Sequence, residues 1–164
     1  MQVPWRRVAS WHCDACGVCC RVYRPKLTAY EYLKLRHTGL VEEKAGRFYI
    51  RKIDGRCPFQ HGNLCSLQHN LKPIACKTFP FIVRRRGEES AAFELNNETY
   101  FVYAELFCPN LCIKSDLKPT RNAYELAKEA VMIFTGKNDF KLLTAQLNPE
   151  TAKLLRPHYH LAMV

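Results

Sequence analysis

Four of the nine cysteines lie within eight residues, in the run Cys13-Asp-Ala-Cys16-Gly-Val-Cys19-Cys20. Thiolate sulfur is a soft ligand, and thiols spaced this closely are far more often metal ligands than anything else. A C-x2-C spacing brings two sulfurs to one metal across a tight turn, and Gly17 supplies the backbone freedom that such a turn needs. The run therefore predicts a metal site.

Two metal chemistries fit this run. C-x2-C-x2-C gives three sulfurs on one loop, and bacterial ferredoxins hold three corners of an iron–sulfur cubane with this spacing. A mononuclear zinc site more often draws two C-x2-C pairs from separate parts of the chain. Because neighbouring side chains usually diverge, we expect Cys19 and Cys20, if both are ligands, to serve different metals or different atoms of one cluster.

The other five cysteines extend the same interpretation. Cys57 and Cys108 are each followed by proline, and a remote Cys-Pro also completes the ferredoxin site. Cys65 and Cys76 lie between them, and Cys112 closes the set. The alternative of buried free thiols or disulfides is disfavoured by the odd count of nine and by the clustered spacing, but it fits Cys112 equally well. The sequence leaves open which cysteines group together and whether there are one or two sites.

Length and composition bound the class of protein. The chain has 164 residues, enough for one compact domain, and no stretch reaches the roughly 18–20 apolar residues of a membrane span. Its first residues lack the apolar segment of a signal peptide. We therefore expect a cytoplasmic protein, where disulfides are disfavoured and clustered cysteines bind metals.

The chain is strongly basic, with a formal net charge of +10. A site of four thiolates carries about −2, so two such sites would lower the net charge to about +6. A basic surface is compatible with nucleic acid, anionic lipid or an acidic protein, and the charge alone selects none of them.

One helix and several short strands are expected to position the cysteines. Thr28 and Glu31 are spaced as in a capping box, which opens a helix. Residues 48–53 alternate as in a strand. Asp54-Gly55 is a turn signal that leads the chain back towards the next cysteine.

Two hairpin patterns follow. The first is a small hairpin with Cys57 and Cys65 near its arms, a common way to build half of a metal site. Antiparallel strands are expected over residues 82–86, 91–95 and 100–107. Arg84–Arg86 is the densest basic run, and we interpret it as a solvated strand end at a hairpin.

The sequence pattern changes after Cys112, from cysteine-rich segments to segments without cysteine. Thr120 can cap a helix over Arg121–Thr135, whose apolar residues recur at helical spacing. Two further helices are expected over residues 139–147 and 149–155, and none of the three contains a cysteine.

These elements predict an α+β fold in a single domain of residues 1–164. Residues 10–112 would form a small cysteine-rich metal-binding core with short antiparallel strands and one helix. Residues 115–164 would form a C-terminal helical extension that packs on the core or binds a protein partner.

The cysteine pattern resembles a known family. Cys13-x2-Cys16-Gly-x-Cys19-Cys20-Arg21, with the later Cys-Pro-Phe and Cys-x2-Phe-Pro-Phe segments, is similar to the CxxCxxCC cysteine-cluster family of YkgJ-like, zinc- or iron-chelating proteins. The resemblance covers roughly residues 10–112. It implies that the eight recurring cysteines of the family are the metal ligands here: Cys13, Cys16, Cys19, Cys20, Cys57, Cys65, Cys76 and Cys108.

The chain departs from the family pattern at two positions. The family commonly has Arg-Pro and Cys-Arg where this chain has Lys72-Pro73 and Cys76-Lys77, and arginine and lysine are not equivalent in a planar, bidentate contact. A related cysteine arrangement occurs in flagellin lysine N-methylases, larger proteins that the resemblance links to iron–sulfur and methyl-donor chemistry. This chain has no Gly-rich turn of the kind that binds a nucleotide or methyl donor.

Three functions follow from these patterns. The favoured one is a metal-binding protein whose cysteines hold an iron–sulfur cluster, with [4Fe–4S] preferred over zinc because of the triple spacing and the Cys-Pro pairs. An iron–sulfur oxidoreductase or a methyl-transfer enzyme is the second, although no catalytic residues are identifiable. The alternative is a zinc-stabilised basic module that binds nucleic acid or an acidic protein, using Arg84–Arg86 with Tyr100 and Tyr103. None of the three requires a membrane.

Overall fold

The computed structural model describes residues 1–67 and 71–137, which divide into two compact units. The first unit comprises residues 1–13 and 77–137, and the second comprises residues 14–67 and 71–76. The chain thus enters the second unit between Cys13 and Asp14 and leaves it between Cys76 and Lys77. Neither boundary lies near residue 112, where the cysteine-rich part of the sequence ends. That residues 1–164 form one domain stays a prediction.

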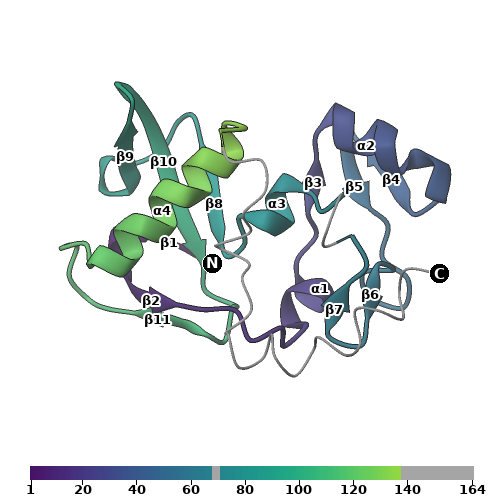
Figure 1. Cartoon of the computed structure of the whole chain (residues 1–164), viewed down its shortest axis with the longest axis horizontal. Helices are drawn as coiled ribbons and strands as arrows, with labels where there is room; N and C mark the ends of the chain where they lie inside the picture. The colour runs from purple at the N-terminus through teal and green to yellow at the C-terminus, as the bar shows by residue number, and fades with distance from the viewer. Residues whose placement is uncertain (68–70, 138–164) are drawn as a thin grey trace. The chain divides into compact units, whose positions relative to one another are not determined.

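The first unit is built on a four-stranded antiparallel sheet (Figure 1). Its central strand is β10 (Glu98–Glu105), which pairs along one edge with β8 (Phe81–Arg84) and along the other edge with both β1 (Gln2–Pro4) and β9 (Ala92–Leu95). A separate two-stranded ribbon joins β2 (Val8–Trp11) to β11 (Leu111–Ile113). Two short 3-10 helices, η1 (Trp5–Arg7) and η3 (Glu89–Ala91), complete this part of the chain.

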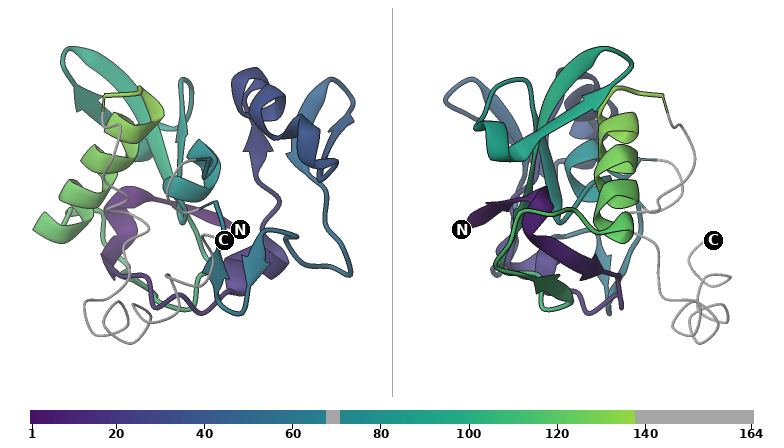
Figure 2. Two further views of the ribbon diagram at one scale, coloured as in Figure 1. Left: turned by 45° about the vertical axis from the view of Figure 1, so that its right-hand side comes forward. Right: turned by 90° about the vertical axis from the view of Figure 1, so that its left-hand side faces the viewer.

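Helix α4 (Arg121–Phe134) covers one face of this sheet (Figure 2). Its small and branched side chains Ala123, Ala127, Ala130 and Val131 are fully buried and recur at helical spacing. They join a core of fourteen buried residues that includes both tryptophans. This confirms the helix predicted after Thr120.

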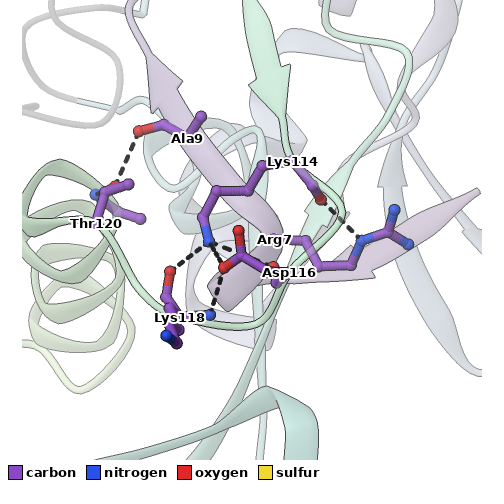
Figure 3. Close-up of polar contacts among 7 residues, drawn as sticks. Arg7, Ala9, Lys114, Asp116, Lys118 and Thr120 are labelled. Carbon is purple, nitrogen blue, oxygen red and sulfur yellow. Dashed lines mark hydrogen bonds and ion pairs between the residues drawn. The ribbon is translucent and has the colours of Figure 1, made fainter.

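Polar contacts fasten the start of α4 to β2 (Figure 3). The Thr120 hydroxyl donates to the carbonyl of Ala9 at 2.9 Å and accepts the backbone N–H of Ala123 at 3.1 Å, as an N-cap does. The Lys114 ammonium bonds the carboxylate of Asp116 and the carbonyl of Lys118, closing the loop before the helix. The two helices predicted over residues 139–147 and 149–155 lie outside the described residues.

The second unit contains a small three-stranded sheet in the order β3 (Lys26–Leu27), β5 (Arg47–Ile50), β4 (Val41–Lys44). Helix α2 (Ala29–Leu35) continues into η2 (Arg36–Thr38) and packs on this sheet. Thr28 and Glu31 form the predicted capping box, with both reciprocal hydrogen bonds present. The core here is much smaller than in the first unit. It consists of Leu27, Leu35, Val41, Ile50 and Phe59.

Four cysteines of the second unit, Cys19, Cys20, Cys65 and Cys76, lie on short elements, whereas Cys16 and Cys57 lie in connecting segments. The short elements are α1 (Val18–Val22), the hairpin of β6 (Gln60–His61) and β7 (Leu64–Cys65), and α3 (Ile74–Lys77). The predicted hairpin and the turn at Asp54-Gly55 are confirmed, the latter by the bridge between Ile53 and Arg56.

The observed fold is α+β, as the sequence predicts, with α1 and α3 as additional short helices in the cysteine-rich part. Of the helices in residues 1–67 and 71–137, none is both long and apolar enough to cross a membrane.

Candidate metal centre

The loop with the cysteine run lies against the β6–β7 hairpin (Figure 1). Gly17 has φ +69°, in the left-handed region that favours glycine, and it is the residue from which α1 begins. Cys19 and Cys20 then lie in the first turn of α1. The backbone N–H of Cys57 donates to the carbonyl of Cys20 at 3.0 Å, so the Cys-Pro segment is joined directly to the helix.

Cys19 and Cys20 interact with each other, contrary to the expectation that neighbouring side chains diverge. The thiol of Cys20 donates a hydrogen bond to the sulfur of Cys19, which lowers the pKa of Cys19 to about 6. The same bond, together with burial, raises the pKa of Cys20. Both residues lie in the first turn of a short helix that begins at a left-handed glycine. The hydrogen bond from Cys20 therefore favours the thiolate form of Cys19, which is the form that binds a metal.

Three more thiols share this region. Cys57 lies in the Cys-Pro turn, Cys65 on β7 and Cys76 on α3. Burial raises the pKa values of all three thiols. The negative charge of Cys19 raises the pKa of each of them further, so all three sulfurs lie within electrostatic reach of Cys19. Five of the eight predicted ligands thus gather within the second unit.

Hydrogen-bond donors and cations offset the cost of burying these thiolates. The N–H of Phe59 bonds the sulfur of Cys57, and the N–H of Leu67 bonds the sulfur of Cys65; both bonds lower the pKa values of the thiols. The charge of the Lys72 ammonium also lowers the pKa values of three of the five thiols, those of Cys19, Cys65 and Cys76. Lys72 entered the sequence analysis only as a departure from the family pattern, and its closeness to the thiols could not be inferred without the fold.

This donor set fits a soft or borderline metal ion, because thiolates bind zinc and iron in preference to hard cations. Within residues 1–67 and 71–137, no three Cys, His, Asp or Glu side chains already stand in a finished coordination arrangement. The thiols are gathered in one region, and metal binding would draw them into coordination distance, as happens where binding and folding are coupled.

The remaining predicted ligands lie elsewhere. Cys16 is exposed in the second unit, whereas Cys13 and Cys108 are half-buried against the core of the first unit. The indole N–H of Trp11 donates to the sulfur of Cys108 at 3.2 Å. Cys112 is exposed on β11, opposite Ser10 of β2. All nine cysteines are free thiols, so the disulfide alternative is not realised in this structure.

Gly17 makes a testable contribution to the site. A Cβ atom at this position would lie 2.5 Å from the amide nitrogen of Gln60, which itself donates to the carbonyl of Gly62 at 2.9 Å. Gly17→Ala should therefore cost about 1–2 kcal/mol from the left-handed backbone and about 1 kcal/mol more from the displaced hydrogen bond. Thermal unfolding of the metal-loaded protein measures the loss.

Gly62→Ala is the matched control, because Gly62 also has a positive φ (58°) but nothing lies within 4 Å of the Cβ atom that alanine would add. Gly62→Ala should lower the melting temperature less than Gly17→Ala, because it adds only the strain of alanine in the left-handed backbone conformation. Equal losses for the two variants would contradict a role of Gly17 in seating the loop on the hairpin.

Glu31 connects α2 to the helix that carries Cys76. One carboxylate oxygen accepts the N–H of Thr28 at 2.7 Å in the capping box, and the other accepts the N–H of Ile74 at 2.6 Å, where α3 begins. The N–H of Cys76 in turn donates to the carbonyl of Pro73 at 2.9 Å. Glu31 is thus a positioning residue for Cys76. The sequence pattern had predicted only the other role of Glu31, in the capping box of α2.

Glu31→Gln should lose one of these two charge-assisted bonds, because an amide nitrogen cannot accept a hydrogen. We expect a loss of about 1.5–3 kcal/mol in the free energy of unfolding and weaker metal binding, measured by guanidinium titration and competition with a chelator. Glu43→Gln is the control, since Glu43 is exposed on β4 and has no side-chain partner in residues 1–67 and 71–137. A Glu31→Gln variant as stable as this control would contradict the positioning role.

Comparison with known proteins identifies the family of this chain. A family model, CxxCxxCC, described as "Putative zinc- or iron-chelating domain", matches residues 12–109. The matched segment is more than half of the chain and spans all eight predicted ligands, so the chain belongs to this family of metal-chelating domains. Searches of the curated proteins and of the solved structures found no match.

Proposed function

We propose that this chain is a metal-binding protein in which Cys13, Cys16, Cys19, Cys20, Cys57, Cys65, Cys76 and Cys108 are the ligands. The observation that carries the proposal is the gathering of five thiols from α1, the Cys-Pro turn, β7 and α3 in one unit with a very small apolar core. Buried thiolates repel one another and are costly without a counter-charge. A bound cation supplies that charge.

An iron–sulfur cluster, [4Fe–4S] in preference to others, fits the ligand pattern better than zinc. The C-x2-C-x2-C run and the two Cys-Pro segments are those of ferredoxins. The N–H groups of Phe59 and Leu67 and the ammonium of Lys72 would bond or face ligand sulfurs and spread their negative charge. A cluster of this kind supplies one-electron transfer, whereas zinc would make the site structural.

The alternative of a nucleic-acid module on Arg84–Arg86 gains no support from the tyrosines. Tyr100 is 1% exposed and Tyr103 is 7% exposed, so neither ring is free to stack on a base. The guanidinium of Arg85 lies over Tyr100, and that of Arg84 lies over Tyr103. These arginines cover the sheet rather than present an open reading surface.

The experiment that tests the proposal is a determination of metal and acid-labile sulfide after anaerobic purification, with an absorption spectrum. We expect iron and sulfide in equal amounts and broad absorption near ~400 nm. Stoichiometric zinc in a colourless protein would keep the metal site but replace the cluster with a structural ion. Absence of any stoichiometric metal would overturn the proposal.

A further inference from the structure

Three arginines lie together next to two of the proposed ligands. Arg21 directly follows Cys20, and Arg56 directly precedes Cys57; the hydrogen bond from the N–H of Cys57 to the carbonyl of Cys20 joins the two segments. Lys52 donates to the carbonyl of Arg21 and so ties the turn after β5 to α1. Arg51 lies in the same turn segment, which runs from β5 towards β6 (Figure 1).

The three guanidinium groups are exposed and carry uncompensated charge. Within residues 1–67 and 71–137, none of them forms an ion pair with a carboxylate. Arg24 and Arg85 differ in this respect, because they pair with Glu42 and Glu98. The segment of residues 51–56 neutralises little of this positive charge, since Asp54 is its one acidic residue.

Aliphatic side chains are exposed among these charges. Val22 is 54% exposed and Ile53 is 48% exposed, although both belong to residue types that are most often buried. Val22 follows Arg21 in sequence, and Ile53 is bridged to Arg56. Exposed aliphatic groups next to arginines have the composition of a protein–protein interface, where arginine is enriched and apolar groups form the centre. A single-stranded nucleic acid would instead require exposed aromatic rings for its bases.

We propose that Arg21, Val22, Arg51, Ile53 and Arg56 form an arginine patch that docks an acidic protein surface carrying apolar side chains. The Ile53–Arg56 bridge, with N···O distances of 3.0 and 2.9 Å, fixes two of its members on one tight turn. The docked partner would lie beside Cys20 and Cys57. That last consequence rests on the proposed metal centre, whereas the binding itself does not.

The test uses the full chain, loaded with metal, and a short fluorescein-labelled peptide that mixes glutamate with leucine. Fluorescence anisotropy should show saturable binding that weakens as salt is raised, because the attraction is electrostatic. Arg56→Glu and Arg21→Glu should each weaken binding about tenfold by placing like charges together. Val22→Ser should weaken it at constant charge, which a purely electrostatic attraction would not explain.

Arg47→Glu is the matched control, because Arg47 is exposed at the opposite end of β5 from Arg51. It should leave the affinity within about twofold of the wild type. An equal loss in Arg47→Glu, no saturable binding to the peptide, or tighter binding of a single-stranded RNA lost in the same variants would each overturn the proposal.

Metal content and circular dichroism are measured on every preparation, which separates the two proposals. A protein without metal that still binds the peptide through these arginines would refute the metal centre alone. A metal-loaded protein that ignores the peptide would refute the arginine patch alone. If Arg21→Glu or Arg56→Glu fails to fold because the substituted residue adjoins a proposed ligand, Arg51→Glu carries the test.

Discussion

Replacing Cys19 or Cys65 with alanine is expected to abolish stoichiometric metal binding. The hydrogen bond from Cys20 lowers the pKa of Cys19 and favours its thiolate, whose charge acts on Cys65 on the hairpin. Structural metal sites of this kind bind with about 10–16 kcal/mol, and loss of one thiolate removes a large share of that energy. Metal analysis of the purified variants measures the effect directly.

Cys112→Ala provides the matched control for this series. Cys112 is exposed on β11 in the first unit, and the family pattern has no counterpart for it. We expect this variant to retain full metal content and a wild-type melting temperature. Full metal content in Cys19→Ala, or loss of metal in Cys112→Ala, would contradict the assigned ligand set.

Removing the metal is expected to unfold the second unit and to leave the first unit folded. The first unit has a core of fourteen buried residues and a four-stranded sheet, and it resembles an ordinary small domain in this respect. The second unit has five buried core residues, with Cys57 packed against them. Units with so small a core usually need a metal or disulfides to fold.

Hydrogen exchange of the metal-free protein tests this expectation. Peptides from β8, β10 and α4 should stay protected, and peptides from β3, β4, β5 and α2 should lose most of their protection. Restoring the metal should restore the second set. Retention of protection in both sets, or its loss throughout, would contradict the idea that the metal supplies the stability of the second unit.

Elements whose sequence signals lie within a few residues were predicted correctly. The capping box at Thr28 and Glu31, the turn at Asp54-Gly55 and the helix after Thr120 depend on neighbours close in sequence, and all three are present. Three strands of the larger sheet, β8, β9 and β10, were also expected, because their segments are rich in the β-branched and aromatic residues that favour strands. Such patterns are readable from sequence because their physical cause lies within a few residues.

Elements stabilised by distant partners were not predicted. β1 has only three residues, and its register is set by β10, about a hundred positions later. α1 has no side-chain cap and begins at a left-handed glycine, so helix propensity gave no indication of it. β4 is rich in charge and is defined by its pairing with β5. In each case tertiary contacts override a weak local preference.

The candidate site shows the same division. The cysteines could be named from their spacing, but their grouping required the fold, because Cys20 and Cys57 meet through a hydrogen bond between segments far apart in sequence. The same holds for Glu31 and Lys72, whose roles depend on residues of other elements. A sequence pattern identifies ligands, whereas the groups that hold and screen them are set by tertiary structure.

X-ray absorption at the metal edge tests the central claim most directly. If the cysteines hold the metal, its first shell consists of sulfur at about 2.3 Å, and Cys65→Ala removes sulfur from that shell or removes the metal altogether. An iron cluster would add a short iron–iron scattering path, which a single zinc ion lacks. A first shell of nitrogen or oxygen at about 2.0 Å would contradict the account.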